Sequence, residues 1–369
     1  MKNTKQSFFL FKILIKAVLF FVVINFLFIL AKDVPIGNIS LYNYVFPGRS
    51  RLPFGENPNL AYNLSMYNLD AMISSHTVSS SGKDEDYKVF LIGDSSVWGF
   101  LQKPDVTLAG FLEQKNQVCE EQPVKIYNLG YPSLSVLKDA MIIEKVQHLQ
   151  PDLILWLVTL ESLPVSTQLN TPLVENNPLL VNQILSEYDL HELQPLTTEI
   201  WEHTLISRRR EIADLIRLQL YGVLWSATGI DQEYPSQYTP ALRDFETDLT
   251  FHEFKIGQMD EDQLALDIIT QIIRQHKETS FIVINEPILI SQGRNSDFRY
   301  NFYYPRWAFN QYREIIKAEM DESRIKYYDF WNLIPETHFT NSAIHLDVYG
   351  ESIFADKIST LISENCQKQ

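Results

Sequence analysis

Five short apolar runs alternate with longer amphipathic stretches after residue 86, and no other feature of the sequence constrains the fold as strongly. Each run is rich in Val, Ile, Leu and Tyr, which is typical of buried strands. The runs are YKVFLIGD (87–94), VKIYNLG (124–130), DLILWLVTLES (152–162), SFIVINEP (280–287) and IKYYDFW (325–331). The helical patterns cover 134–149, 261–277, 308–320 and 350–365. Strand and helix in succession predict a mostly parallel sheet with helices on both faces.

The composition indicates an ordered globular chain and excludes one class of partner. With 369 residues, of which 45% are hydrophobic, the chain can build at least one large core. Its formal net charge is −15 at pH 7, and no segment clusters the Lys and Arg residues that phosphate contacts need. We therefore expect no nucleic-acid partner.

The N-terminal segment differs from the rest because an uncharged apolar stretch runs from 17 to 31. Lys12 and Lys16 can extend their ammonium groups toward the headgroups, so residues 8–31 can cross a hydrocarbon core of roughly 30 Å. The stretch ends in Phe-Ile-Leu-Ala-Lys-Asp, without a small-x-small pair for a signal peptidase. This favours an uncleaved signal-anchor, a transmembrane helix, over a cleaved signal peptide.

Positive charge lies on the N-terminal side of this span, at Lys2 and Lys5 as well as at the two lysines above. That asymmetry predicts a cytoplasmic N-terminus and an extracytoplasmic main domain. The chain is thus expected to be a single-pass protein of the cell membrane that contacts the lipid bilayer through residues 8–31.

The composition suggests three regions along the chain. Residues 1–32 form the tail and anchor, and residues 33–86, rich in Asn, Ser, Tyr, Pro and Gly, form a lead-in or stalk. Residues 87–369 form the α/β domain, with a helical insertion at about 163–262 between the third and fourth strands.

The insertion contains the stretch SRRREIADLIRLQLYGVLW (207–225), in which apolar residues follow three consecutive arginines. The simpler interpretation is a helix whose apolar face packs on the domain. The alternative is an interfacial helix against anionic lipid, since a basic cluster beside an apolar face binds there. The apolar positions are Ile212, Leu215, Ile216, Leu218, Leu220 and Leu224.

The two cysteines leave their state open. Outside the cytoplasm Cys119 and Cys366 could form one disulfide, and two unpaired structural cysteines are equally compatible with the sequence. Two cysteines cannot form a tetrahedral metal site, and the chain has no HExxH motif. We expect neither a metal nor a cofactor.

Polar residues and a glycine occupy the places where function gathers in a parallel sheet, the carboxyl ends of its strands. Asp94, Ser95 and Ser96 follow the first strand, Gly130 ends the second, and His345 lies just before the last helix. These positions can converge although they are far apart in sequence. A Ser-Ser turn that only caps the next helix is the structural alternative.

These segments resemble the motif blocks of the SGNH or GDSL hydrolases. The first block is similar to GDSSVWG (93–99), the glycine block to YNLGYPS (127–133) and the histidine block to AIHLDVYGESIFADKI (343–358). The resemblance covers roughly residues 87–365. It implies a three-layer α/β/α sandwich with a mostly parallel, flavodoxin-like sheet, and hydrolysis or transfer of acyl groups on oxygen.

The resemblance also implies roles for individual residues. Ser95 would be the nucleophile and His345 its general base, while the backbone N–H groups of Ser95 and Gly130 would face the oxyanion. A serine hydroxyl is a weak nucleophile until a base takes its proton, and donors aimed at the developing oxyanion lower the barrier.

The chain departs from the family's third block, which carries Gly-x-Asn-Asp with the Asn donating to the oxyanion. Here the segment reads VTLESL, with Thr159, Glu161 and Ser162. A carboxylate cannot donate a hydrogen bond unless it is protonated. Either the site holds a neutral acid, or Glu161 has another role, such as binding a hydroxyl of the acceptor.

The family's Asp, three residues before the His, is also absent, because Ser342 occupies that position. Asn341 could orient the imidazole of His345 by accepting its N–H, although it stabilises an imidazolium less than a carboxylate would. Asp347 follows the histidine closely in sequence, which argues against it as a substitute. The prediction is a Ser–His dyad with Asn341 as its candidate third member.

The long loop after the fourth strand resembles substrate-binding apparatus. It reads NEPILISQGRNSDFRYNFYYPRW, and long loops at carboxyl ends often line a site. Its mixture of Tyr, Trp and Arg suits a sugar or an anionic polymer, whereas a packed Tyr-rich loop is the structural alternative. The candidate substrate-binding residues are Asp94, Glu161, Asn285, Glu286 and Arg294.

The sequence therefore predicts a serine-dependent ester hydrolase or O-acyltransferase that acts on an acylated glycan or lipid of the cell envelope. A transferase would need an acyl donor at the membrane, for which a membrane acyl-donor protein is a candidate partner. The alternative is a catalytically silent SGNH-like glycan-binding or scaffold domain.

Overall fold

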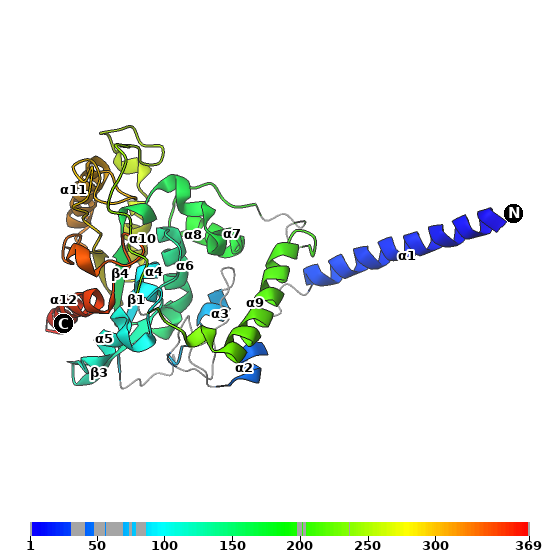
Figure 1. Ribbon diagram of the computed structural model, residues 1–369, viewed down its shortest axis with the longest axis horizontal. Coiled ribbons are helices and arrows are strands. Elements are labelled where there is room, and N and C mark those ends of the chain that lie inside the picture. Colours follow the sequence, from blue (N-terminus) through cyan, green and yellow to red (C-terminus); the bar gives the residue numbers. More distant parts are fainter. Residues whose placement is uncertain are drawn as a thin grey trace.

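A six-stranded sheet forms the centre of the computed structural model, which describes residues 2–30, 41–47, 56, 69–73, 76–78, 86–197, 201, 204–235 and 237–367 (Figure 1). The strand order is β2-β3-β1-β4-β5-β6, and every pairing is parallel except that of β2 with β3. The strands are β1 Tyr87–Ile92, β2 Val118–Cys119, β3 Gln122–Asn128, β4 Leu153–Val158, β5 Ser280–Asn285 and β6 Lys326–Asp329.

The order of the parallel strands confirms the predicted flavodoxin-like fold. Leaving out the short edge strand β2, the strands follow the order second, first, third, fourth, fifth along the chain, which is the flavodoxin-like doubly wound order. All five predicted strands are present. The antiparallel strand β2 was not predicted, because two residues carry no periodic signal.

Helices cover both faces of the sheet. Phe90 and Ile92 of β1 face one hydrophobic core, while Val89 and Leu91 face the other, as alternation along a strand requires. The first core is covered by α6 Val136–Val146, α10 Leu266–Gln275 and α11 Arg306–Glu322. The second is covered by α5 Leu108–Gln114 and α12 Val348–Cys366. The three-layer architecture is therefore confirmed.

The predicted lead-in at 33–86 falls mostly outside the described residues. Within it lie the short helices α2 Leu41–Val45 and α3 Leu69–Ile73, and Leu69 belongs to the first core. The predicted insertion at 163–262 contains α7 Pro172–Glu175, α8 Pro178–Glu187 and α9 Arg209–Thr228, besides short 3-10 helices.

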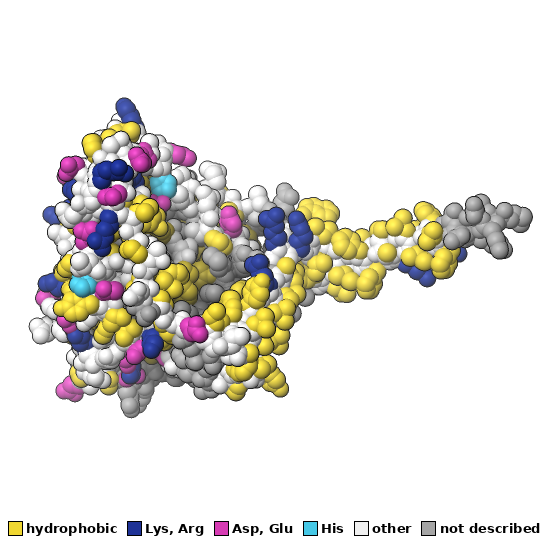
Figure 2. All heavy atoms as spheres, in the orientation of Figure 1, with side chains coloured by type: hydrophobic (Ala, Val, Ile, Leu, Met, Phe, Trp, Pro, Cys, Tyr) yellow, Lys and Arg dark blue, Asp and Glu magenta, His cyan; other side chains and the backbone are white. Residues whose placement is uncertain are grey.

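One helix long and apolar enough to cross a membrane occurs in the described part of the chain. Helix α1 runs from Lys2 to Leu30, and its apolar portion is Phe9–Leu30. It projects away from the body, and hydrophobic side chains cover its surface (Figures 1 and 2). Ala31, the last residue of the predicted span, lies outside the described residues.

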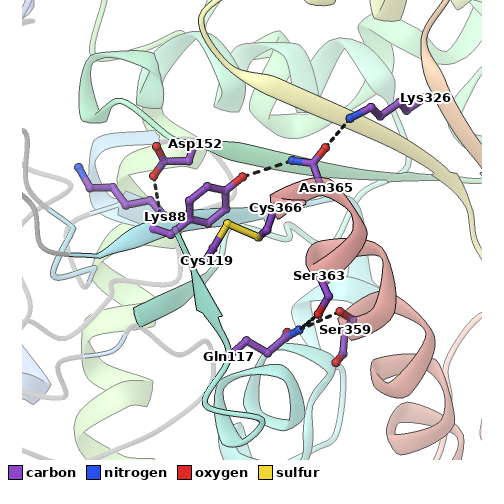
Figure 3. Close-up of a disulfide and its surroundings, with 10 residues drawn as sticks. Lys88, Gln117, Cys119, Asp152, Lys326, Ser359, Ser363, Asn365 and Cys366 are labelled. Carbon is purple, nitrogen blue, oxygen red and sulfur yellow. Dashed lines mark hydrogen bonds between the residues drawn. A yellow bond between two sulfur atoms is a disulfide. The ribbon is translucent and has the colours of Figure 1, made fainter. Parts of the chain in front are cut away.

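Cys119 and Cys366 form a disulfide that joins the edge strand β2 to the end of α12 (Figure 3). Beside it, Asn365 donates to the Tyr87 hydroxyl at 3.3 Å and accepts from Lys326 Nζ at 2.5 Å. Tyr87 and Lys326 are the first residues of β1 and β6. The end of α12 is therefore tied to the amino edge of the sheet, opposite the carboxyl ends of the strands.

We predict that replacing both cysteines by serine lowers the free energy of unfolding by about 2–5 kcal/mol. The bridge closes a sequence separation of 247 residues, so it restricts the unfolded chain strongly. The measurement is denaturant unfolding of the detergent-solubilised full chain. A reductant should shift the wild-type curve and leave that of the double variant unchanged. Coincident curves for the oxidised wild type and the double variant would contradict the prediction.

Candidate functional site

The turn after β1 presents Ser95 at the carboxyl edge of the sheet. The short helix α4, Ser95–Trp98, follows directly, and Asp94 caps it by accepting a hydrogen bond from Ser96 N–H at 2.8 Å. A Cβ atom on Gly93 would lie 2.6 Å from Val97 Cγ2, so only glycine lets α4 fold back so closely on the strand.

Ser95 and His345 are brought into contact across 250 residues of sequence. Ser95 Oγ lies 2.8 Å from His345 Nε2. On the other side of the ring, Asn341 Oδ1 lies 3.1 Å from Nδ1. Because an amide oxygen can only accept, Nδ1 carries the proton, and Nε2 is left to accept from the serine hydroxyl. The geometry is that of a serine, a base and an orienting acceptor in line.

The surroundings of His345 favour a neutral imidazole. The ring is half-buried, and its centroid lies 5.0 Å from that of Phe100. Burial lowers the pKa of His345, and the negative charge of Asp94 offsets part of that effect. A neutral imidazole near pH 7 can take a proton, as a general base must.

A buried lysine, Lys138, is hydrogen-bonded to the turn that carries Ser95. Lys138 Nζ donates to the carbonyl oxygens of Gly93 at 2.7 Å and Tyr131 at 3.2 Å, and it forms an ion pair with Asp139 at 2.5 Å. Sequence reasoning missed Lys138, because a lysine within an amphipathic helix normally faces solvent. A charged residue in the middle of an otherwise apolar helix face was the only available signal.

Glu286 lies beneath α4. Its side chain is buried, and Ser96 Oγ donates to its Oε2. The other oxygen, Oε1, is also buried, and Glu286 shares a side-chain hydrogen bond with Asp94. Burial, followed by the nearby charge of Asp94, raises the pKa of Glu286 well above its ordinary value. The raised pKa favours the neutral form of Glu286, whose Oε2 holds Ser96. Its role in binding substrate stays a prediction.

Asn285, the preceding residue, does not reach the site. Its side chain is fully buried, donates to Asp329 Oδ1 at 2.8 Å and accepts from the Tyr312 hydroxyl at 3.0 Å. Successive residues of a strand face opposite sides of a sheet, so Asn285 faces the α11 layer when Glu286 faces Ser96. The structure therefore corrects the expectation that Asn285 binds substrate.

The loop after β5 is packed mainly on itself. Arg294 has an exposed side chain. Arg299 is buried and donates to the carbonyl oxygens of Asp248 at 2.7 Å, Phe302 at 2.8 Å and Tyr303 at 3.0 Å. The alternative interpretation of this segment, a packed Tyr-rich loop, describes this arrangement.

Glu161 forms an ion pair with His252, which no sequence motif singles out. Its Oε1 lies 2.8 Å from His252 Nε2, and that bond raises the pKa of His252. Thr159, nearby in the sequence, is buried with its hydroxyl 2.9 Å from that of Tyr304. The described residues here include no side-chain amide in the place of the family's Asn.

The two backbone donors predicted for an oxyanion differ in their surroundings. Ser95 N–H has no acceptor among the described residues. Gly130 N–H already donates to Asn128 Oδ1 at 3.1 Å, while Asn128 Nδ2 donates to the carbonyl oxygen of Val97 at 2.9 Å. Asn128 thus ties β3 to α4, and the Gly130 N–H is occupied in this structure.

Asp347 has two structural partners in place of the catalytic histidine. Its Oδ1 accepts from Gly350 N–H at 2.7 Å, which caps α12, and its Oδ2 lies 3.1 Å from His338 Nδ1. This agrees with the expectation that it does not substitute for the missing acid. Within the described ranges, no group of three or more His, Cys, Asp or Glu residues is arranged to hold a metal ion.

No family model matches the chain, and no curated protein does. Among solved structures it overlaps a G-D-S-L family lipolytic protein from Veillonella parvula, at 12% identity and a TM-score of 0.34, over 75% of this chain and 98% of that one. An aryl esterase from M. smegmatis overlaps it at 12% identity and a TM-score of 0.34, over 75% of this chain and 98% of that one. A carbohydrate acetylesterase family member from Sinorhizobium meliloti overlaps it at 10% identity and a TM-score of 0.32, over 74% of this chain and 96% of that one. Overlaps this weak support no conclusion about the present chain.

The resemblance to the SGNH hydrolases extends from the sequence motifs to their arrangement in space. The three blocks lie at the carboxyl edge of a flavodoxin-like sheet, and the serine and histidine of the first and last blocks touch.

We predict that Glu286→Gln stabilises the protein increasingly as the pH rises. Unfolded, Glu286 loses its proton near 4.5, whereas the folded protein holds the proton to a much higher pH. Between these two values the folded state binds more protons, so wild-type stability falls with rising pH. The amide of the variant cannot ionise, and its oxygen can still accept the bond from Ser96. The difference in melting temperature between variant and wild type should therefore be smallest below about pH 4.5 and should grow above it.

The exposed Glu253 provides a matched control. Glu253→Gln makes the same chemical change at the surface and should give no such trend. A Glu286→Gln difference that stays constant from acid to neutral pH would contradict the buried neutral carboxyl.

Proposed function

We propose that the chain is a membrane-anchored, serine-dependent enzyme of the SGNH type that hydrolyses or transfers ester-linked acyl groups. One observation carries the proposal, namely the contact of Ser95 Oγ with His345 Nε2 at 2.8 Å, backed by Asn341 at 3.1 Å from Nδ1. A half-buried hydroxyl at the carboxyl edge of a parallel sheet, bonded to a neutral imidazole, is arranged for nucleophilic attack.

In the proposed reaction, Ser95 Oγ attacks the carbonyl carbon of an ester while its proton passes to His345 Nε2. The tetrahedral intermediate then collapses, the alcohol leaves with the proton from His345, and the acyl group stays on Ser95. Water or a sugar hydroxyl next attacks the acyl-enzyme with His345 as base, which frees Ser95. Water gives hydrolysis, and a sugar hydroxyl gives O-acyl transfer.

Charge develops at two places in this reaction. The imidazolium would be stabilised by the Asn341 amide oxygen and, at longer range, by the Asp94 carboxylate, which favours the protonated ring. The oxyanion would face Ser95 N–H. The Gly130 N–H would serve as a second donor when its bond to Asn128 yields to the stronger acceptor.

Three features support an envelope substrate. The apolar helix α1 tethers the domain, the flanking lysines favour an extracytoplasmic body, and the disulfide suits an oxidising compartment. An acylated glycan or lipid of the cell envelope lies within reach of such a domain. A membrane acyl-donor protein would supply a transferase.

A second candidate function, a silent glycan-binding or scaffold domain, is favoured by the oxyanion region. Gly130 N–H is occupied, and Glu161 replaces the family's Asn-bearing block while pairing with His252. The same domain without an oxyanion site would bind substrate and leave the ester intact. Reactivity of Ser95 separates the two functions.

We predict that Ser95→Ala abolishes covalent labelling of the full chain by a fluorophosphonate and lowers hydrolysis of p-nitrophenyl acetate at least about 1000-fold. Ser96→Ala is the matched control, because its hydroxyl lies next in sequence but is bonded to Glu286. That variant should retain labelling. Circular dichroism checks that both variants are folded. Labelling that survives Ser95→Ala, or its absence from wild type, would favour the silent domain.

A further prediction concerns Asn341, whose side chain is exposed. Asn341→Asp should raise the labelling rate about tenfold near pH 7, because a carboxylate attracts the proton onto His345 more strongly than an amide does. Asn341→Ala should lower the rate about 100-fold, since the ring loses its orienting acceptor. The rates are measured with the same probe, and equal rates for all three chains would remove Asn341 from the site.

A further inference from the structure

Helix α9 exposes a set of large apolar side chains, unlike a helix packed on a soluble domain. Its exposed side carries Ile216, Leu220, Tyr221, Leu224 and Trp225, which we call the α9 face. A water-facing helix places such residues against the core, and the apolar stripe then points inward.

The side of α9 that faces the body mixes polar and small residues with the half-buried Ile212, Leu215 and Val223. Gln219 and Ser226 are buried there, and a Cβ on Gly222 would lie 2.3 Å from the Tyr42 ring of α2. Gln219 Oε1 also accepts from Leu41 N–H at 2.7 Å. The simpler sequence interpretation therefore holds only in part. Ile212, Leu215 and Leu218 are half-buried, whereas Ile216, Leu220 and Leu224 are exposed.

Helix α2 extends the apolar surface. It packs against α9, and its residues Leu41, Tyr44 and Val45 are exposed, Tyr44 by 87%. Figure 2 shows hydrophobic side chains over α9 and α2 on the side of the body from which α1 leaves. A soluble monomer rarely exposes so many large apolar side chains together, and such surfaces mark sites of interaction with a protein or a membrane.

The N-terminal end of α9 meets the transmembrane helix. Ile206 N–H donates to Asn25 Oδ1 at 3.4 Å, and the Arg208 guanidinium lies 5.9 Å from the centre of the Phe28 ring. Asn25 itself is buried. In Figure 1, α9 runs across the direction of α1 along the side of the body from which α1 projects.

These contacts set the height of α9 relative to the bilayer. The apolar part of α1 has 22 residues, or about 33 Å at 1.5 Å per residue, which matches the hydrocarbon core. Asn25 and Phe28 lie in its last two turns, at the boundary with the headgroups. The start of α9 is therefore held at that boundary, and a helix that crosses α1 from there runs along the membrane surface.

We propose that α9 and α2 lie on the bilayer that α1 spans, with the α9 face inserted among the lipid chains. Tyr221 and Trp225 stack at 5.7 Å and supply the amphipathic rings typical of membrane interfaces. The exposed Arg209 and Arg210, at the end next to α1, meet the phosphates of the lipid headgroups. The body is thus held by two adjoining attachments and cannot swivel about α1.

The test is spin-label accessibility on the full chain, reconstituted at one copy per nanodisc of phosphatidylcholine and phosphatidylglycerol. Labels are placed separately by Leu220→Cys and Leu224→Cys, both at exposed positions. Leu242→Cys is the matched control, an exposed leucine outside α9. The bonded Cys119 and Cys366 do not react.

The expected result is a ratio of oxygen to aqueous nickel-chelate accessibility about tenfold higher at 220 and 224 than at 242. Ratios at both positions equal to that at 242 would overturn the proposal. The same ratio is also measured in vesicles that hold many copies. A high ratio found there but lost at one copy per disc would overturn the proposal as well, because a second chain would then cover the face. Each position is scored on its own, so failure of one variant to fold leaves the other decisive.

Discussion

The parallel pairing of β1 with β3 and β4 is the constraint on which the rest of the structure depends. Every side chain of β1 is buried, and its two faces anchor separate cores. Parallel strands end at the same edge, so Ser95 and Gly130 become neighbours there. Helix α12 then links the two edges. Its last turn is bonded to the amino edge through Cys366 and Asn365, and its 19 residues, about 28 Å long, place its start and the preceding His345 at the carboxyl edge.

Carboxyl groups shape the electrostatics around this edge. Asp94 and Glu286 lie close together in a buried place, and two negative charges there would repel each other strongly. The raised pKa of Glu286 favours its neutral form, which removes one of them. The remaining charge of Asp94 raises the proton affinity of His345 and partly offsets its burial. Burial thus favours the neutral form of both groups, while the charge of Asp94 reinforces this effect at Glu286 and opposes it at His345. The ion pair of Lys138 with Asp139 lies beside the same turn.

Much of the fold could be predicted, because it follows from local pattern. The five parallel strands and the helices α6, α10, α11 and α12 each carry a clear period, and turn residues separate them. The placement of Ser95 and Gly130 followed from the rule that parallel strands share a carboxyl edge, and that of His345 from its position just before the last helix. The environments of Asn285 and Glu286 could not be predicted. They are adjacent in sequence, and only the packing of α11 and α4 decides which of the two faces the site.

The sequence by itself determined the period of each element, the apolar length of α1 and the order of the polar residues, since these are properties of neighbours along the chain. Only the tertiary structure decided that Cys119 meets Cys366, that Asn341 meets His345 Nδ1, and that Asp347 caps a helix. It also decided that Ile216, Leu220 and Leu224 of α9 face outward. A hydrophobic period shows that a helix has an apolar side, but what covers that side depends on elements distant in sequence, and at a membrane it depends on the solvent.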